Sequence, residues 1–302
     1  MTDLTPPAAR RPLGTSGIEV SSLAWGNWRL CGTDTAAAAR LLHAAIDCGI
    51  DFVDTADIYG PDNGEAFGAS EVLLGRVLAA EPGLRRRIVL ASKGGIVIGT
   101  PYDSSADYLT SAIDASLARL GVECLDLWQI HRPDILTHPS EIARAMEAAQ
   151  RAGKIRSFGV SNFTTAQIAA LQPFLSMPIV STQPEISALQ IAPVENGELD
   201  QAIAMNMAVL AWSPLGGGRI ANPGTPREQA VAAALDAVAA EAGVSRTAAA
   251  YAWLMAHPSR PIPIVGSQRA ERIVEAMDAF KVRWTRASWY AVLVASRGVP
   301  LP

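Results

Sequence analysis

Residues 50–53 read IDFV, residues 87–91 read RIVLA, and residues 125–130 read LDLWQI. Each run is short and largely apolar, which is typical of a strand buried in a sheet. Stretches of helical character at residues 65–79 and 105–120 separate the runs. Because consecutive parallel strands need such a crossover, the three runs predict strands of one parallel sheet.

The same alternation extends along the rest of the chain. Strands are predicted at residues 22–25, 155–160, 179–183, 208–212 and 261–265. Helices are predicted at residues 34–48, 139–152, 164–171, 197–205, 227–242, 245–256 and 269–280, with a final helical extension at 286–296. Eight strands, each followed by a helix within about 250 residues, favour a closed (β/α)8 TIM barrel over two doubly wound halves.

The ends of the chain complete this prediction. Residues 12–20 (PLGTSGIEV) predict an N-terminal β-hairpin with glycine at its turn. Residues 1–11 are expected to form a disordered tail. No stretch rich in glycine, serine or proline interrupts the alternation, so residues 1–302 are predicted to form a single domain.

Composition excludes several classes of partner. The chain carries 25 Lys and Arg against 29 Asp and Glu, a net charge of −4, without basic runs beyond a short arginine triplet. Such a chain gives no electrostatic reason to expect nucleic acid or an anionic membrane as a partner. Its N-terminus lacks the apolar segment of a secretory signal, and no stretch approaches the length of a membrane span. Three cysteines without CxxC spacing favour reduced thiols, so we expect a cytoplasmic protein and, by default, a monomer.

Four polar residues follow the first three apolar runs. Asp54 and Tyr59 come after IDFV, Lys93 after RIVLA, and His131 directly after LDLWQI. The C-terminal ends of barrel strands all open onto one face, where active sites lie. These four side chains are therefore expected to meet in one pocket.

Their residue types indicate proton transfer. A tyrosine donates a proton to a carbonyl oxygen more readily when its pKa, ordinarily about 10, is lowered. A nearby ammonium group has this effect, and Lys93 could supply it, with Asp54 holding the lysine in place. His131 could donate a hydrogen bond to the same oxygen or relay a proton.

Each residue alone also has an ordinary structural explanation. Tyr59 could be an amphipathic surface residue, Asp54 could cap a turn, and His131 could be a hydrogen-bonded core histidine. Lys93 lies in the apolar context VLASKGGIVI, where a solvated lysine is less expected. The set of four on three successive strand ends favours a site.

Signals for a cofactor lie in the second half of the chain. No GxGxxG motif follows the first strand, so a Rossmann mode of dinucleotide binding is not supported. Ser161, Asn162 and Gln183 stand at strand ends and could fix a carboxamide by hydrogen bonds. Trp212 offers a flat surface for stacking, and the glycine-rich residues 213–218 offer a backbone cradle, although a tight turn would explain the glycines equally well.

An anion site is predicted after the last strand. Gly266 and Ser267 precede a predicted helix that bears Arg269 and Arg272. Backbone N–H groups, the helix dipole and two guanidinium groups together favour a phosphate, and barrels often bind phosphate at this corner.

Taken together, these pieces resemble the aldo-keto reductase superfamily from about residue 12 to the last helix. The matching motifs, in family order, are GIDFVDTADIYG, ASKGG, LDLWQIHRPD, GKIRSFGVSNF, QPE, AWSPLGGG and VGSQRAERI. The resemblance implies an eight-stranded α/β barrel closed at its bottom by the N-terminal hairpin. It also implies reversible reduction of aldehydes and ketones with NADPH and without a metal.

The resemblance assigns a role to each matching residue. Tyr59 would be the general acid, Lys93 and Asp54 its tuning pair, and His131 the residue that orients the carbonyl. The nicotinamide would be held by Ser161, Asn162, Gln183 and Trp212, the pyrophosphate by Ser213, Leu215 and Gly216, and the adenosine 2′-phosphate end by Gly266, Ser267, Gln268, Arg269, Arg272 and Glu275.

Two positions depart from the family pattern. Trp212 stands where many members have tyrosine, which keeps an aromatic face. Gly266 stands where many relatives carry a lysine, which weakens the case for a strong NADPH preference, while Arg269 and Arg272 partly restore it.

The sequence therefore predicts an NADP(H)-dependent carbonyl reductase acting on a small-molecule carbonyl substrate, with Trp28 as an apolar wall of the substrate pocket. One alternative is a nicotinamide-nucleotide-binding regulatory or sensor subunit on the same barrel with little turnover. Another is a metal-dependent hydrolase, but the chain has only four histidines and no HxH pair, so no metal is expected.

Overall fold

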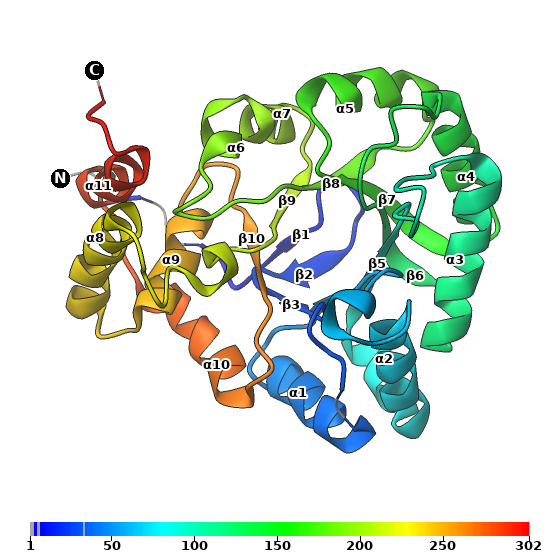
Figure 1. The fold of residues 1–302 in the computed structure, drawn as a ribbon, viewed down its shortest axis with the longest axis horizontal. Helices are drawn as coiled ribbons and strands as arrows, with labels where there is room; N and C mark the ends of the chain where they lie inside the picture. The colour runs from blue at the N-terminus through cyan, green and yellow to red at the C-terminus, as the bar shows by residue number, and fades with distance from the viewer. Residues whose placement is uncertain (1–2, 5–6, 33, 302) are drawn as a thin grey trace.

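The computed structural model describes residues 3–4, 7–32 and 34–301, and eight parallel strands within them close into a barrel. The order around the barrel is β10, β3, β4, β5, β6, β7, β8 and β9, so strands adjacent in sequence lie side by side (Figure 1). Their bounds are β3 Ala24–Gly26, β4 Phe52–Asp54, β5 Val89–Gly94, β6 Leu125–Ile130, β7 Ile155–Ser161, β8 Ile179–Gln183, β9 Ala208–Ala211 and β10 Ile262–Val265. The predicted (β/α)8 barrel is confirmed.

Helices surround the barrel in the order that the alternation predicts (Figure 1). They are α1 Thr35–Asp47, α2 Ala69–Ala80, α3 Ala106–Leu120, α4 Pro139–Arg151, α5 Thr165–Leu171, α6 Ala192–Glu195, α7 Glu198–Ala204, α8 Pro226–Ala242, α9 Arg246–Met255, α10 Ala270–Glu275 and α11 Arg286–Arg297. Side-chain caps fix several starts: Asp34, Ser105 and Thr164 each accept a hydrogen bond from a backbone N–H of the first turn.

The helices differ most from the prediction at three places. Helix α2 begins at Ala69 rather than at residue 65, because Gly64 and Gly68 have φ angles of +78° and +79°, which no α-helix can contain. The predicted helix at residues 269–280 is α-helical only to Glu275 and continues as a 3₁₀ helix, Ala276–Lys281. The short helix α6 was not predicted.

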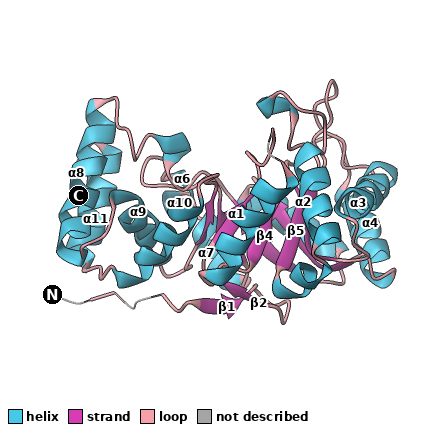
Figure 2. Cartoon of the chain, turned by 90° about the horizontal axis from the view of Figure 1, so that it is seen from below, coloured by secondary structure: helices cyan, strands magenta, loops and turns pink. Residues whose placement is uncertain are grey.

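The N-terminal hairpin closes the bottom of the barrel. Its strands, β1 Arg10–Pro12 and β2 Glu19–Ser21, lie below the N-terminal ends of the barrel strands in Figure 2. Leu13, Ile18 and Val20 are buried in the barrel interior, in one apolar cluster with residues of the barrel strands. At the turn, a Cβ on Gly14 would lie 2.2 Å from the carbonyl oxygen of Val180, so only glycine fits there.

Part of the predicted disordered tail is ordered. The sequence assigns residues 1–11 to the tail, but Arg10 and Arg11 belong to β1 and pair with β2. The backbone N–H of Leu4 also donates to the carbonyl oxygen of Trp284 at 2.8 Å. Residues 1–2 and 5–6 of this segment lie outside the described residues. Arg10 and Arg11 are ordered because their backbone pairs with β2, and a prediction from the local sequence does not include that pairing.

The C-terminal extension packs on the barrel through two tryptophans. Trp253 of α9 and Trp289 of α11 stack with ring centroids 4.9 Å apart. Each indole N–H donates to the backbone oxygen of the other residue, at 3.1 and 3.0 Å. This buried reciprocal pair fixes α11 against α9. Within the described part of the chain, no helix combines the length and the apolar character needed to cross a lipid bilayer.

Candidate active site

Strand alternation points the predicted catalytic side chains into the mouth of the barrel. On β4, Phe52 belongs to the interior cluster, so Asp54, two residues later, faces the same way. On β5, Ala91 faces inward and Ser92 faces α2, which places Lys93 inside. Lys93 therefore lies within β5, whereas the sequence analysis had placed it after the strand.

Lys93 and Asp54 form a buried ion pair. The Nζ atom of Lys93 lies 2.6 Å from Oδ2 of Asp54 and donates a second hydrogen bond to the carbonyl oxygen of Thr55 at 2.8 Å. The other carboxylate oxygen, Oδ1, accepts from the side-chain amides of Gln183 at 3.1 Å and Gln129 at 3.4 Å. Every oxygen of this carboxylate is therefore bonded, which a buried charge requires.

The charge of Lys93 is kept by its neighbours. Burial alone would lower the pKa of Lys93, but the Asp54 carboxylate, and after it the Tyr59 hydroxyl, raise that pKa above its ordinary value. Lys93 is consequently an ammonium cation at neutral pH. A fixed positive charge thus stands at the centre of the barrel mouth.

Tyr59 lies beside this cation. The Nζ atom of Lys93 is 4.9 Å from the centroid of the Tyr59 ring. Burial raises the pKa of Tyr59, while the charge of Lys93 and its hydrogen bond lower it, and burial outweighs them. The sequence analysis expected a net lowering, so the direction differs. The phenol therefore carries its proton at neutral pH.

His131 completes the group. Its ring packs edge-on against that of Tyr59, with centroids 5.8 Å apart, and its backbone N–H donates to the carbonyl oxygen of Gly94 at 2.8 Å. Burial, followed by the charges of Lys93 and Arg132, holds the pKa of His131 well below its usual range. A neutral imidazole can donate one hydrogen bond, but it is not protonated at neutral pH and cannot serve as a general acid. The structure thus brings all four predicted residues together.

The ends of β7, β8 and β9 are joined by a chain of hydrogen bonds. The indole Nε1 of Trp212 donates to Oδ1 of Asn162 at 2.9 Å. The amide Nδ2 of Asn162 donates to Oγ of Ser161 at 2.8 Å and to the carbonyl oxygen of His131 at 3.1 Å. Ser161 in turn donates to the carbonyl oxygen of Gln183 at 2.9 Å. These four predicted cofactor residues therefore form one preformed wall beside His131 and Asp54.

The loop after β9 is a tight backbone turn. Ser213 has a φ of +51°, and its carbonyl oxygen accepts from the backbone N–H of Gly216 at 2.8 Å. The hydroxyl of Ser213 also accepts from the N–H of Gly217 at 3.1 Å. Leu215 is partly buried and packs on the core. The sequence analysis offered two interpretations of residues 213–218, a backbone cradle and a tight turn. The structure shows a tight turn, whose backbone could still serve as a cradle.

The corner after β10 holds the remaining predicted residues. Space surrounds the Cα of Gly266, where a Cβ would meet nothing within 4 Å. The carbonyl oxygen of Ser267 accepts from Trp25, and Glu275 accepts from Thr247 at 3.1 Å. Arg269 forms an exposed ion pair with Glu271 at 2.6 Å. Helix α10 has only six residues, so the long helix that the sequence predicted at this corner is not formed.

Gln268 decides whether this corner fits a ligand. Both Nε2 and Oε1 of its amide are buried, and neither has a hydrogen-bond partner among the described residues. Buried amides are ordinarily bonded, because an unbonded one costs free energy. A polar group bound at the corner would satisfy both atoms, so the residues present fit the nucleotide that the sequence predicts.

Comparison with known proteins identifies the family. Residues 22–292 match the model of the aldo/keto reductase family. The chain belongs to the aldo/keto reductase family. It is 62% identical to a 6-dehydroglucose reductase of Novosphingobium aromaticivorans, over 100% of both chains, and 35% identical to a 6-dehydroglucose reductase of Agrobacterium fabrum, over 93% of this chain and 96% of that one. The family and these oxidoreductase relatives support carbonyl reduction in general.

A solved structure supports the fold. The crystal structure of a thermostable aldo-keto reductase, in complex with the inhibitor epalrestat, aligns with a TM-score of 0.81 and 24% identity, covering 95% of this chain and 100% of that one. The barrel described above is thus shared with an experimentally determined member of the same family.

Three buried polar residues were missed by the sequence analysis. Gln129 is fully buried and bonds Asp54; its position inside the apolar run LDLWQI was the available signal. Asn27 and Asp57 are also buried, and neither side chain has a hydrogen-bond partner within the described ranges. Burial, and then the charge of Glu71, raise the pKa of Asp57 well above its ordinary value. Nothing in DTADIYG marks Asp57 apart from Asp54.

The predicted substrate residue lies at the rim. Trp28 is 41% exposed, and the guanidinium of Arg29 lies 4.9 Å from its ring centroid. Its carbonyl oxygen accepts from Asn63 at 2.7 Å, which ties it to the loop that carries Tyr59. A second cation–π contact, from Arg132 to the ring of Trp212 at 5.5 Å, was not predicted.

Proposed function

We propose that this protein reduces an aldehyde or ketone to an alcohol with NADPH as the hydride donor and Tyr59 as the general acid. The observation that carries the proposal is the position of Lys93, which bonds the buried carboxylate of Asp54 and lies 4.9 Å from the Tyr59 ring. A cation so placed stabilises the phenolate that forms when Tyr59 gives up its proton.

The other residues of the mouth would position the substrate and the cofactor. The neutral His131 would donate a hydrogen bond to the carbonyl oxygen and hold it near the Tyr59 hydroxyl. Ser161, Asn162 and Trp212 would hold the nicotinamide, and Gln268 with Arg269 and Arg272 would hold the adenosine phosphate. When bound, this cofactor supplies the hydride that adds to the carbonyl carbon. Tyr59 then delivers the proton to the oxygen, and solvent restores it.

For the substrate we propose the C6 aldehyde of a hexose. This rests on the two relatives that carry the name 6-dehydroglucose reductase, at 62% and 35% identity. Reduction of such an aldehyde would yield the ordinary hexose. Against the alternative of a sensor subunit with little turnover stands the complete group of Asp54, Tyr59, Lys93 and His131, which binding alone does not require.

The test is Tyr59→Phe, assayed with 6-dehydroglucose and, for comparison, with benzaldehyde. Because a positioned acid contributes on the order of 10²- to 10⁴-fold, kcat should fall by at least about 100-fold while NADPH still binds and quenches its fluorescence. Tyr290→Phe, at an exposed tyrosine of α11, is the matched control and should keep full activity. Retained turnover in Tyr59→Phe would refute the role of the phenol, and equal kcat/KM for both aldehydes would refute the hexose.

A further inference from the structure

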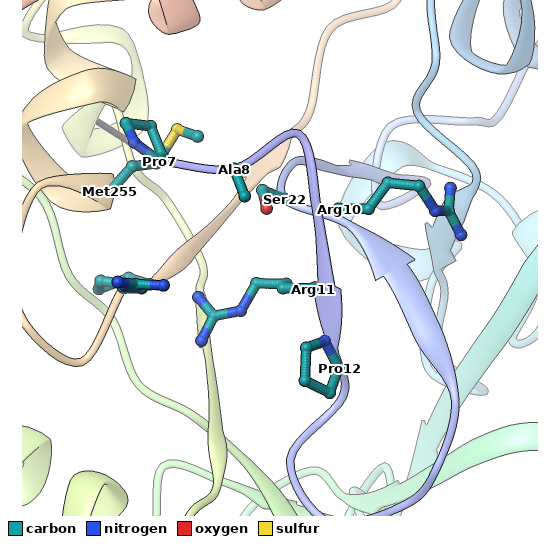
Figure 3. A pocket seen from close by; sticks show the side chains of 9 residues that line it. Pro7, Ala8, Arg10, Arg11, Pro12, Ser22 and Met255 are labelled. Carbon is teal, nitrogen blue, oxygen red and sulfur yellow. The ribbon is translucent and has the colours of Figure 1, made fainter. Parts of the chain in front are cut away.

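A small pocket lies at the end of the barrel opposite the catalytic group. It is bounded by the hairpin strand β1 and by the segment that leads into β10, and its cavity has a volume of about 110 Å³. Arg10, Arg11 and Arg260 line it together with Ser22 and Met255. Figure 3 labels Arg10, Arg11, Ser22 and Met255 around the pocket. Three arginines around one small cavity are unexpected in a chain whose net charge is −4.

Within the described part of the chain, one of these three arginines has a counter-charge. Arg10 forms an ion pair with Asp51 at 2.6 Å and donates to the carbonyl oxygen of Glu19 at 3.1 Å. Figure 3 shows Arg10 and Arg11 leaving β1 in opposite directions, so Asp51 serves Arg10 alone. Among the residues that the structure describes, no carboxylate pairs with Arg11 or Arg260. Two positive charges therefore share the pocket without compensation.

The guanidinium of Arg11 is held in an unfavourable environment. Its Nε atom is buried and has no hydrogen-bond partner in the described part of the chain. Burial, and then the positive charge of Arg260, lower the pKa of Arg11 to about 10. A buried donor on a charged group is costly when it is left unbonded. An acceptor with negative charge would relieve both the unused donor and the repulsion.

The second arginine is held by an unusual backbone. Arg260 has a φ of +47°, in the left-handed region that residues other than glycine rarely adopt. A hydrogen bond from its N–H to the carbonyl oxygen of His257, at 2.7 Å, fixes the turn. Such outliers persist where the surrounding structure imposes them, and they gather at ligand-binding positions.

We propose that this pocket binds a phosphate group, free or as a monoester, between the guanidinium groups of Arg11 and Arg260. Two unpaired positive charges match the charge of a dianion, and guanidinium groups bind phosphate oxygens by paired hydrogen bonds. Ser22 also lines the pocket. The site is separate from the cofactor corner, which lies at the other end of the strands.

Isothermal titration calorimetry with inorganic phosphate tests the proposal, in a zwitterionic buffer at constant ionic strength. The full-length protein should bind phosphate saturably, and acetate, a singly charged oxyanion, should bind at least tenfold more weakly. A parallel titration with glucose 6-phosphate distinguishes a monoester from free phosphate, and tighter binding of either one supports the site. Absence of saturable binding by both, or acetate binding as tight as theirs, would overturn the proposal.

Two variants assign the binding to the pocket. Arg11→Gln removes the buried cation, and Arg260→Gly removes the second one at a backbone angle that glycine adopts freely, so both should fold. Each should weaken phosphate binding by about tenfold or more, since a hydrogen bond to a charged group contributes that much. Thermal unfolding without phosphate confirms that each variant is folded.

Two control variants separate this pocket from other arginines. Arg86→Gln removes an exposed positive charge that does not line the pocket, and Arg269→Gln removes one at the cofactor corner. Both should leave phosphate binding at the barrel bottom unchanged. If the Arg269 variant loses the binding and the Arg11 and Arg260 variants keep it, the phosphate occupies the cofactor corner and the proposed pocket is wrong.

Discussion

The two halves of the barrel mouth differ in how completely their polar groups are bonded. In the half formed by β4, β5 and β6, Lys93 and both oxygens of Asp54 have partners within the protein. At β10, Gln268 has an amide with no partner among the described residues, and Arg269 is held only by an exposed neighbour. The difference fits the proposed roles, in which the fold fixes Lys93 and Asp54 in position while the amide of Gln268 is left to bond the proposed cofactor.

The largest effect is expected from Lys93→Met, which removes the ion pair in the half of the mouth formed by β4, β5 and β6. Removing the cation leaves the Asp54 carboxylate buried and unpaired, so the free energy of unfolding should fall by about 3–5 kcal/mol. Carbonyl reduction should be lost with it. Urea denaturation followed by circular dichroism measures the first effect, and an activity assay measures the second.

A double variant provides the control for this prediction. Lys93→Met combined with Asp54→Asn removes both charges, so most of the stability should return while activity stays absent. If Lys93→Met alone were as stable as the wild type, the ion pair would not be the element that fixes this half of the mouth.

A smaller effect is expected from Arg272→Gln, at the corner after β10. Arg272 is exposed and has no ion pair within the described ranges, whereas Arg269 is held by Glu271. Arg272 is therefore the guanidinium free to meet the 2′-phosphate, and its loss should weaken NADPH binding by about tenfold. NADH, which lacks that phosphate, should bind as before.

Fluorescence titration of both cofactors checks this, with Arg269→Gln beside it. The Arg269 variant should lose less NADPH affinity, because part of its guanidinium is engaged by Glu271. An equal loss of NADH and NADPH affinity in Arg272→Gln would show that Arg272 does not bind the 2′-phosphate.

The same contrast explains how much could be predicted from the sequence. Strands β6 and β8 match the prediction residue for residue. In β6 the run LDLWQI ends on the apolar Ile130, where the strand also ends. Strand β5 is longer than predicted, because Ser92 and Lys93 interrupt the apolar pattern. Their polar atoms are bonded by Glu71 and Asp54, which come from other elements. The residues next to Ser92 and Lys93 in the sequence do not indicate which distant residues will bond them.

The candidate site shows the same limit. The convergence of Asp54, Tyr59, Lys93 and His131 followed from strand order alone, since every strand of a barrel ends on one face. The net direction of the Tyr59 pKa did not follow, because burial depends on the whole surrounding structure. For the same reason no motif marked Asp57 as an unbonded carboxylate.

The smallest effect is expected from Asp57→Asn, which changes a buried carboxyl group that lacks a hydrogen-bond partner among the described residues. Asp57 has no hydrogen-bond partner for either oxygen in the described chain, and burial raises its pKa well above 3.8. The folded state therefore holds this proton more tightly than the unfolded state does. Stability should accordingly fall as the pH rises from about 3.8 through the raised pKa. An uncharged asparagine removes this dependence, so the variant should be more stable than the wild type at pH 7.5, by on the order of 1 kcal/mol.

Urea midpoints of wild type and Asp57→Asn at pH 4.5 and pH 7.5 measure the difference. The advantage of the variant should shrink at the lower pH, where the wild-type carboxyl is protonated in the folded state and partly protonated in the unfolded state. A variant that is less stable at pH 7.5 would show that Asp57 is ionised and has a partner. Asp57 would then be a bonded, buried carboxylate like Asp54.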